Sequence, residues 1–153
     1  MPVPRISYGP GSQEGTFAPH DGKWDLRGKK FAKIGTALKG WGVMVFSTPG
    51  RIDEATVKNF IRQFCVTYAQ HGGSVEIKDP PIMYADPKKA VGTSIFELYK
   101  KAGNKVNSKP QMLFFILAQK STLPYNEIKA FCELNIGLVS QCNYSRILCL
   151  LYS

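Results

Sequence analysis

Two runs of consecutive apolar residues dominate the hydrophobic pattern of the chain, Trp41 to Phe46 and Met112 to Leu117. Apolar runs of this length, without alternating polar positions, are typical of strands buried on both faces of a parallel sheet. Two further segments are weaker strand candidates, Ser74 to Ile77 and Ile136 to Ser140. The pattern therefore predicts a sheet with at least two buried central strands.

Three helices are predicted between these strands. Asp53 to about Gln70 carries apolar residues at helical spacing, and Gly72 and Gly73 follow as a stop signal. These apolar positions are Val57, Phe60, Ile61, Phe64 and Tyr68.

Thr93 or Ser94 is a candidate cap for a second helix that runs through Lys101, with Gly103 as its stop. The third predicted helix spans Tyr125 to Asn135. Strands that alternate with helices indicate an α/β fold. We expect a Rossmann-like single domain with a central, mostly parallel sheet and helices on both faces.

Residues 1–22 are rich in Pro, Gly and Ser, which argues against a helix and for a linker or extended arm. We expect the α/β domain to occupy residues 23–153. Near its start, Trp24, Leu26 and Phe31 are candidate docking anchors. The chain shows neither a signal-peptide core nor an apolar stretch as long as a membrane span. We expect a soluble protein of the cytoplasm, with a nuclear pool as the alternative.

The chain has 153 residues and a formal net charge of +9, from 20 Lys and Arg against 11 Asp and Glu. This excess favours polyanionic partners such as nucleic acid. The alternative is a soluble surface that is simply basic.

The four cysteines are Cys65, Cys132, Cys142 and Cys149, and no pair has the spacing of a zinc site. We therefore expect neither a bound metal nor a cofactor, and a reducing compartment.

The candidate ligand-binding residues follow the second apolar run. Tyr125 and Lys129 are four positions apart, so a helix places them on the same face. They follow the loop Gln119 to Pro124, which leaves the carboxyl end of a predicted strand, where α/β sheets bind ligands. An aromatic ring beside a cation suits an anion attached to a flat ring. Each residue also has a structural reading: Tyr125 packs against the loop, Lys129 is a solvated surface residue, and Gln141 faces solvent.

Taken together, Tyr125-Asn-Glu-Ile-Lys129 and Asn135-Ile-Gly-Leu-Val-Ser-Gln-Cys142 resemble the MID domain of eukaryotic Argonaute proteins, including fungal ones. Gly22 to Phe31 resembles the segment where the preceding linker reaches MID, and Trp41 to Phe46 resembles its first strand. The resemblance covers roughly residues 2–142.

The resemblance implies a module that anchors the 5′-monophosphorylated end and first nucleotide of a small guide RNA. It implies phosphate contacts from Tyr125, Lys129, Gln141 and the backbone amide of Cys142. It further implies that the first base stacks on Tyr125 and that its edge is recognised by Lys120, Ser121, Thr122, Leu123 and Pro124. UMP and AMP would bind better than GMP and CMP.

The resemblance also implies that the partners are the guide RNA 5′ end and the other domains of a parent Argonaute. We expect a monomer in isolation. One departure concerns the tail: the family continues into a long helix that supplies a further lysine. Residues 143–153 are apolar, contain Arg146 as their one cation and lack lysine. We therefore expect a shortened C-terminal part.

Enzyme signatures such as GxSxG, HExxH, Walker A and GxGxxG are absent from the sequence. We therefore expect a non-enzymatic RNA-binding module. The alternative is a protein-interaction domain of a silencing complex, with a weak or vestigial nucleotide pocket. A third hypothesis is a small enzyme with a nucleotide-binding fold.

Overall fold

The central sheet is built on the two apolar runs. The computed structural model describes residues 4–119 and 122–144. Strands β3 (Trp41–Phe46) and β5 (Met112–Leu117) lie side by side in parallel, with Trp41 opposite Met112 and Phe46 opposite Leu117. Nearly all of their side chains are buried. Burial on both faces explains why neither run alternates with polar residues.

Two shorter or more exposed strands flank this central pair. Strand β4 (Ile82–Tyr84) pairs with β3, and β6 (Val139–Tyr144) pairs with β5. The order is β4-β3-β5-β6, and all three pairings are parallel. The prediction of a Rossmann-like, mostly parallel sheet is confirmed.

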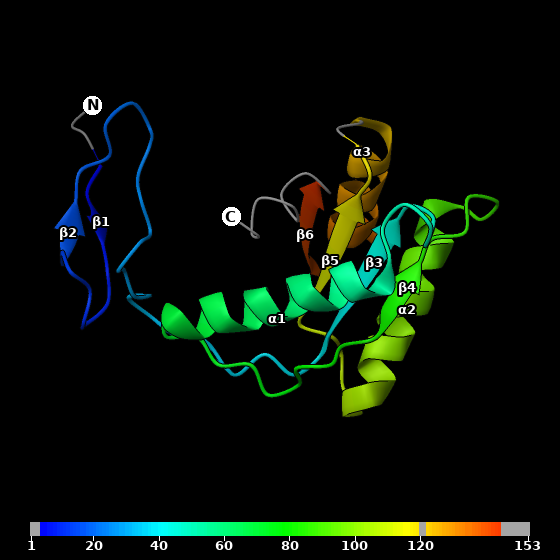
Figure 1. Ribbon diagram of the computed structural model, residues 1–153, viewed down its shortest axis with the longest axis horizontal. Helices are drawn as coiled ribbons and strands as arrows, with labels where there is room; N and C mark the ends of the chain where they lie inside the picture. The colour runs from blue at the N-terminus through cyan, green and yellow to red at the C-terminus, as the bar shows by residue number, and fades with distance from the viewer. Residues whose placement is uncertain (1–3, 120–121, 145–153) are drawn as a thin grey trace.

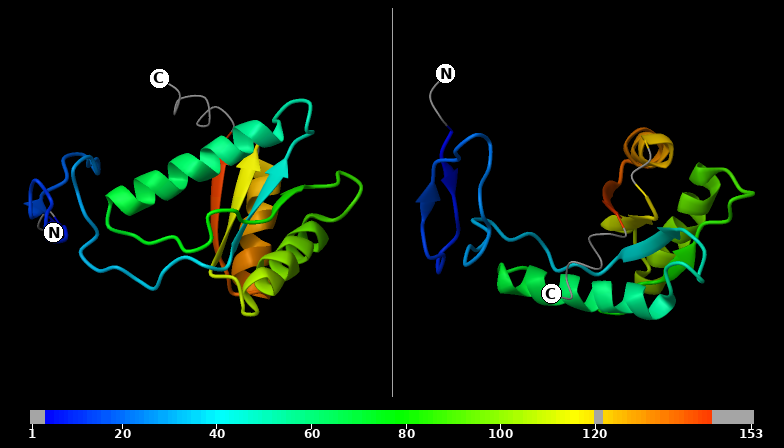
Figure 2. Two further views of the ribbon diagram at one scale, coloured as in Figure 1. Left: turned by 60° about the horizontal axis from the view of Figure 1, so that its bottom comes forward. Right: turned by 45° about the horizontal axis from the view of Figure 1, so that its top comes forward.

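Helices cover both faces of the sheet, as predicted. Helix α1 (Glu54–Gln70) lies on one face, whereas α2 (Val91–Val106) and α3 (Thr122–Ala130) lie on the other (Figures 1 and 2). Within the described ranges, no helix combines the length and the apolar character that crossing a bilayer requires.

An aromatic cluster joins α1 to the sheet. The ring centroids of Phe64 and Phe114 lie 4.7 Å apart, and Trp41 and Phe60 each pack against Phe114 at 5.8 Å. Such aromatic pairs contribute about 0.5–1.5 kcal/mol each beyond the area they bury. The opposite face has a core of aliphatic side chains and Phe115, to which α3 contributes Ile128.

The N-terminus of α1 confirms its predicted start. The Asp53 carboxylate accepts a hydrogen bond of 2.7 Å from the backbone N–H of Thr56. This is the arrangement of a capping aspartate, and bonding to Thr56 lowers the pKa of the Asp53 carboxyl.

The fourth strand lies later in the sequence than predicted. In the segment Ser74 to Ile77, only Val75 forms a bridge, to Leu38. The strand is β4, which follows Pro80 and Pro81, and the Pro81 carbonyl accepts from the Val43 N–H. Prolines are compatible with the beginning of an edge strand, and β4 begins directly after this pair.

Helix α2 is longer at both ends than predicted. It begins after Ala90, without a side-chain cap, and Ser94 is buried inside it. Gly103 does not end it, because the helix continues to Val106. A Cβ at Gly103 would lie 2.9 Å from the Ser108 carbonyl oxygen, so glycine there permits close packing. The helix ends at Asn107, which takes the left-handed conformation with φ of 52°.

The region that carries the motif also differs from the predicted boundaries. Helix α3 begins three residues before Tyr125, at Thr122, and continues into a π-helical turn over Phe131–Asn135. Gly137 then takes a φ of 60°, which turns the chain into β6. Because β6 runs from Val139 to Tyr144, Gln141 lies within a strand and not after one.

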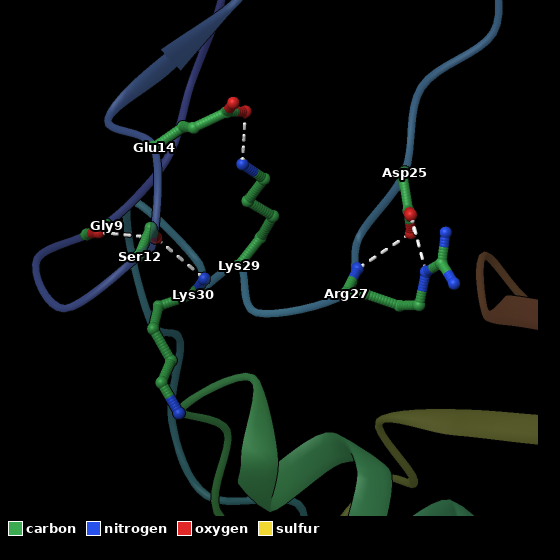
Figure 3. Close-up of polar contacts among 7 residues, drawn as sticks. All are labelled: Gly9, Ser12, Glu14, Asp25, Arg27, Lys29 and Lys30. Carbon is green, nitrogen blue, oxygen red and sulfur yellow. Dashed lines mark hydrogen bonds and ion pairs between the residues drawn. The ribbon is translucent and has the colours of Figure 1, made fainter.

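Residues 4–31 form a separate layer beside the C-terminal end of α1. Strands β1 (Ile6–Ser7) and β2 (Thr16–Phe17) pair as an antiparallel hairpin. The buried Lys29 ammonium lies 2.6 Å from the Glu14 carboxylate, and the Ser12 hydroxyl accepts from the Lys30 N–H (Figure 3). The domain boundary at residue 22 stays a prediction. These contacts join the predicted arm to Lys29 and Lys30, which lie after that boundary.

Candidate functional site

The connections between strands create a cleft at the carboxyl edge of the sheet. From β3 the chain crosses one face through α1 to reach β4, whereas from β5 it crosses the other face through α3 to reach β6. In parallel α/β sheets, ligands bind where two such connections diverge. A cavity of about 350 Å³ lies at this point, between the ends of β3 and β5.

Two loops line this cavity. The predicted loop after β5 contributes Gln119 and Pro124, and the loop after β3 contributes Ser47, Thr48 and Arg51. The loop after β5 thus lies at the carboxyl end where it was expected, although Lys120 and Ser121 fall outside the described residues.

The three residues from the loop after β3 were not predicted from the sequence. This loop lies at the same carboxyl edge as the loop after β5, because the two strands are parallel neighbours. Arg51 is exposed, so its guanidinium can meet an anion from solvent.

Lys129 lies on the side of α3 that faces β6. Its ammonium donates to the carbonyl of Ser140 at 2.7 Å and to the hydroxyl of the same residue at 3.0 Å. An ammonium has three N–H donors, so one remains for another acceptor. No carboxylate among the described residues forms an ion pair with this half-buried cation.

Tyr125 lies one helical turn before Lys129 on the same face of α3. The residue is 38% exposed, which leaves part of it accessible to a ligand. Leu123 is more exposed, at 71%, and Pro124 lies in the first turn of the helix, where proline displaces no helical hydrogen bond. Thr122 is the first residue of α3.

Two thiols lie near the Lys129 ammonium. Burial raises the pKa of the Cys132 thiol to about 11, and hydrogen bonding from Ser140 and the charge of Lys129 oppose this rise. Burial also raises the pKa of Cys142, again opposed by Lys129. Both thiols are therefore neutral at pH 7, and they add no negative charge beside the lysine.

Gln141 does not join this group. Side chains alternate along a strand, and Cys142 packs into the core on the α3 face. The Gln141 side chain therefore lies on the α1 face, where it lines a cavity with Phe60 and Phe64. Its amide donates to the Cys142 carbonyl at 3.1 Å. The structure thus brings Lys129, Ser140 and Cys142 together, with Tyr125 on the same side, and leaves Gln141 on the other.

Of the predicted tail, Asn143 and Tyr144 complete β6, whereas residues 145–153, including Arg146, lie outside the described residues. The shortened C-terminal part therefore stays a prediction.

Comparison with known proteins identifies the family. Residues 18–101 match the family model described as "Mid domain of argonaute". The chain is 36% identical over 147 residues to Protein argonaute of Schizosaccharomyces pombe, covering 95% of this chain and 17% of that protein. It is 26% identical over 145 residues to Protein argonaute PNH1 of Oryza sativa subsp. japonica, covering 93% of this chain and 14% of that protein. The chain thus spans under a fifth of the length of these relatives.

A solved structure has a similar fold. The C-terminal lobe of a budding yeast Argonaute superposes with a TM-score of 0.68 and 15% identity, covering 97% of this chain and 32% of that one. At this identity the match supports the fold alone. The family match extends over more than half of the chain and therefore shows the family as well. The chain belongs to the Argonaute family and contains its Mid domain, a domain that is in general non-catalytic.

Proposed function

We propose that this chain anchors the 5′-monophosphorylated end of a small guide RNA, with Lys129 as the principal phosphate ligand. The observation that carries the proposal is the half-buried ammonium of Lys129, held by the two Ser140 oxygens and without a carboxylate partner among the described residues. Both oxygens are neutral, so the positive charge at this site remains available to an anion.

A phosphate between α3 and β6 would meet three kinds of group. Lys129 has one donor left, Tyr125 has a hydroxyl, and β6 offers the backbone amide of Cys142. Charge-assisted hydrogen bonds of this kind are roughly twice as strong as neutral ones. A terminal monophosphate carries more charge than an internal phosphodiester, so the site would favour an RNA end.

The first base would stack on the accessible face of Tyr125, which contributes about 1–3 kcal/mol in comparable complexes. Its edge would then face the segment from Lys120 to Pro124, including Ser121, whose last three residues, Thr122, Leu123 and Pro124, begin α3. We propose that this segment recognises the base mainly through its main chain, giving UMP and AMP an advantage over GMP and CMP. Arg51 lines the neighbouring cavity at the carboxyl edge together with Pro124.

Gln141 has a conditional role in this proposal. To reach a phosphate at Lys129, its amide would have to leave the Cys142 carbonyl and turn around the edge of β6. We therefore assign it a smaller contribution than Lys129.

The proposed module is non-enzymatic, and we propose that it acts as one domain of a longer Argonaute protein in RNA silencing. The relatives' much greater lengths support this second part. We also propose the cytoplasm as its compartment, supported by the unpaired state of Cys65, Cys132 and Cys142.

Backbone amide chemical shifts test the proposal. The ¹⁵N-labelled chain is titrated with UMP and, separately, with uridine. We expect UMP to shift the amides of Tyr125, Lys129 and Cys142, and uridine, which lacks the phosphate, to leave those of Lys129 and Cys142 in place. The Lys129→Met variant should lose this response, and Lys101→Met, an exposed lysine on α2, should keep it. Unmoved amides at millimolar UMP would contradict the proposal.

The second candidate is a protein-interaction domain with a weak nucleotide pocket. The position of Gln141 on the opposite face favours it, because one of the expected phosphate ligands is turned away. Lys129→Glu distinguishes the two functions. It should abolish nucleotide binding under the first, and it should leave binding of a silencing partner intact under the second.

A further inference from the structure

A second concave surface lies away from the proposed phosphate site, between α1 and the segment that leads to β4. It encloses about 630 Å³, within the range of specific ligand sites. One wall is a single face of α1, formed by Lys58, Ile61, Arg62, Cys65, Val66 and Ala69. The opposite wall includes Val75, Lys78 and Ile82. We call this surface the α1 groove.

The interior of the α1 groove is apolar. Ile61 is almost fully buried at its base, whereas Val66 is 47% exposed on α1. An exposed β-branched residue beside a cavity provides apolar surface that the apolar side chain of a partner can cover. The groove lining contains no aromatic residue in the described part of the chain.

Cations surround this apolar interior. Lys58 pairs with Glu54 of its own helix and Arg62 donates to the Asn59 side chain, whereas Lys78 has no ion-pair partner among the described residues. The one carboxylate in the lining, Asp79, is already paired with Lys105 at 2.6 Å. The groove therefore presents net positive charge around an apolar centre.

We infer that the α1 groove binds an extended acidic peptide segment of a partner protein, with a bulky aliphatic side chain as its anchor. Carboxylates on the peptide complement Arg62 and Lys78, and the aliphatic side chain contacts Ile61 and Val66. Single-stranded nucleic acid fits less well, because its bases bind proteins by stacking on aromatic side chains, which this groove lacks. The inference does not depend on nucleotide binding at Lys129.

Fluorescence anisotropy with three labelled probes tests the inference. The first is the peptide Glu-Asp-Glu-Leu-Glu-Leu-Asp-Glu-Asp, and the second replaces both leucines with serine. The third is an RNA oligonucleotide of equal length with a 5′-hydroxyl, which lacks the terminal phosphate required by the other site. We expect the leucine peptide to bind more tightly than the serine peptide and the RNA.

Variants locate the binding surface. The double variant Arg62→Glu with Lys78→Glu should weaken binding of the leucine peptide by about tenfold or more, since close charge pairs across interfaces couple strongly. The matched control, Lys101→Glu with Lys109→Glu, makes the same charge change at exposed positions outside the groove.

The control should retain affinity within about twofold. Equal losses in the two double variants, equal binding of the serine peptide, or tighter binding of the RNA through Arg62 and Lys78 would each overturn the inference.

Discussion

Gln141 and Lys129 lie on opposite faces of the sheet. Lys129 reaches β6 from α3 and bonds Ser140, whereas the next residue, Gln141, points to the face covered by α1. Two residues that the motif assigns to one phosphate are therefore separated by the strand itself. This separation gives the two side chains different expected contributions to nucleotide binding.

We predict that Lys129→Met weakens UMP binding by about tenfold or more, because a hydrogen bond to a charged group is worth about 1.5–3 kcal/mol. Gln141→Ala should weaken it by less than about threefold, since its amide is engaged with the Cys142 carbonyl. Isothermal titration calorimetry at fixed salt measures both. Equal losses in the two variants would mean that Gln141 reaches the phosphate when the nucleotide binds.

Arg51 provides a separate test of the cavity at the carboxyl edge. We predict that Arg51→Ala weakens UMP binding severalfold and makes it less dependent on salt, because an exposed cation near a phosphate acts through a screened field. Arg62→Ala, which lines the α1 groove and not this cavity, is the matched control. If the two variants behave alike, the cavity lies outside the nucleotide site.

Gly103→Ala tests close packing at the end of α2. Helix propensity alone favours alanine over glycine by about 1 kcal/mol. The added Cβ would lie 2.9 Å from the Ser108 carbonyl oxygen, so we predict a net loss of stability in urea unfolding. Asn104→Ala, the next residue in the same helix, should be neutral or slightly stabilising. A more stable Gly103→Ala variant would show that the turn at Ser108 yields readily.

The pH dependence of stability should report on Cys132. Its pKa is raised from 9.0 to about 11, so below pH 9 the thiol is protonated in both the folded and the unfolded chain. Between pH 9 and 11 the Cys132 thiol loses its proton in the unfolded chain and keeps it in the folded chain. The free energy of unfolding therefore falls as pH rises through this range. We predict that Cys132→Ala shows a shallower fall in unfolding midpoint from pH 9 to 11 than the unmodified chain. Parallel curves would contradict the burial of this thiol.

Glu14 and Lys29 allow the N-terminal hairpin to be tested. Glu14→Gln leaves the buried Lys29 ammonium without its carboxylate, whereas Lys29→Met replaces the cation with an apolar side chain. Removing one partner of a buried charge is more costly than replacing the charge itself. We therefore predict faster amide hydrogen exchange at Tyr8 and Gln13 in Glu14→Gln than in Lys29→Met. The reverse order would indicate that packing of the Lys29 stem dominates.

The parts of the fold predicted from sequence are those with a strong periodic signal. Trp41 to Phe46 and Met112 to Leu117 were predicted with the observed bounds, because burial on both faces makes the whole run apolar. β4 was missed because it is only three residues long and follows two prolines. Such a strand has too few positions for periodicity to reveal it.

The candidate site was predicted in part for a similar reason. Helical spacing fixed the relation of Tyr125 to Lys129, since both lie on one element. The orientation of Gln141 depends on where β6 begins, and a shift in strand register by one residue moves a side chain to the other face. Arg51 comes from a distant segment, so only the parallel pairing of β3 and β5 brings it near the loop after β5.

The sheet also determines how the two proposed ligands would influence each other. Lys129 lies on one face and the α1 groove on the other, and they share no lining residue in the described part of the chain. Energetic effects at separated sites without common partners usually add. A guide 5′ end and an acidic peptide would then occupy the domain together with a coupling free energy near zero. The domain could in this way hold RNA and protein at once, with neither displacing nor recruiting the other.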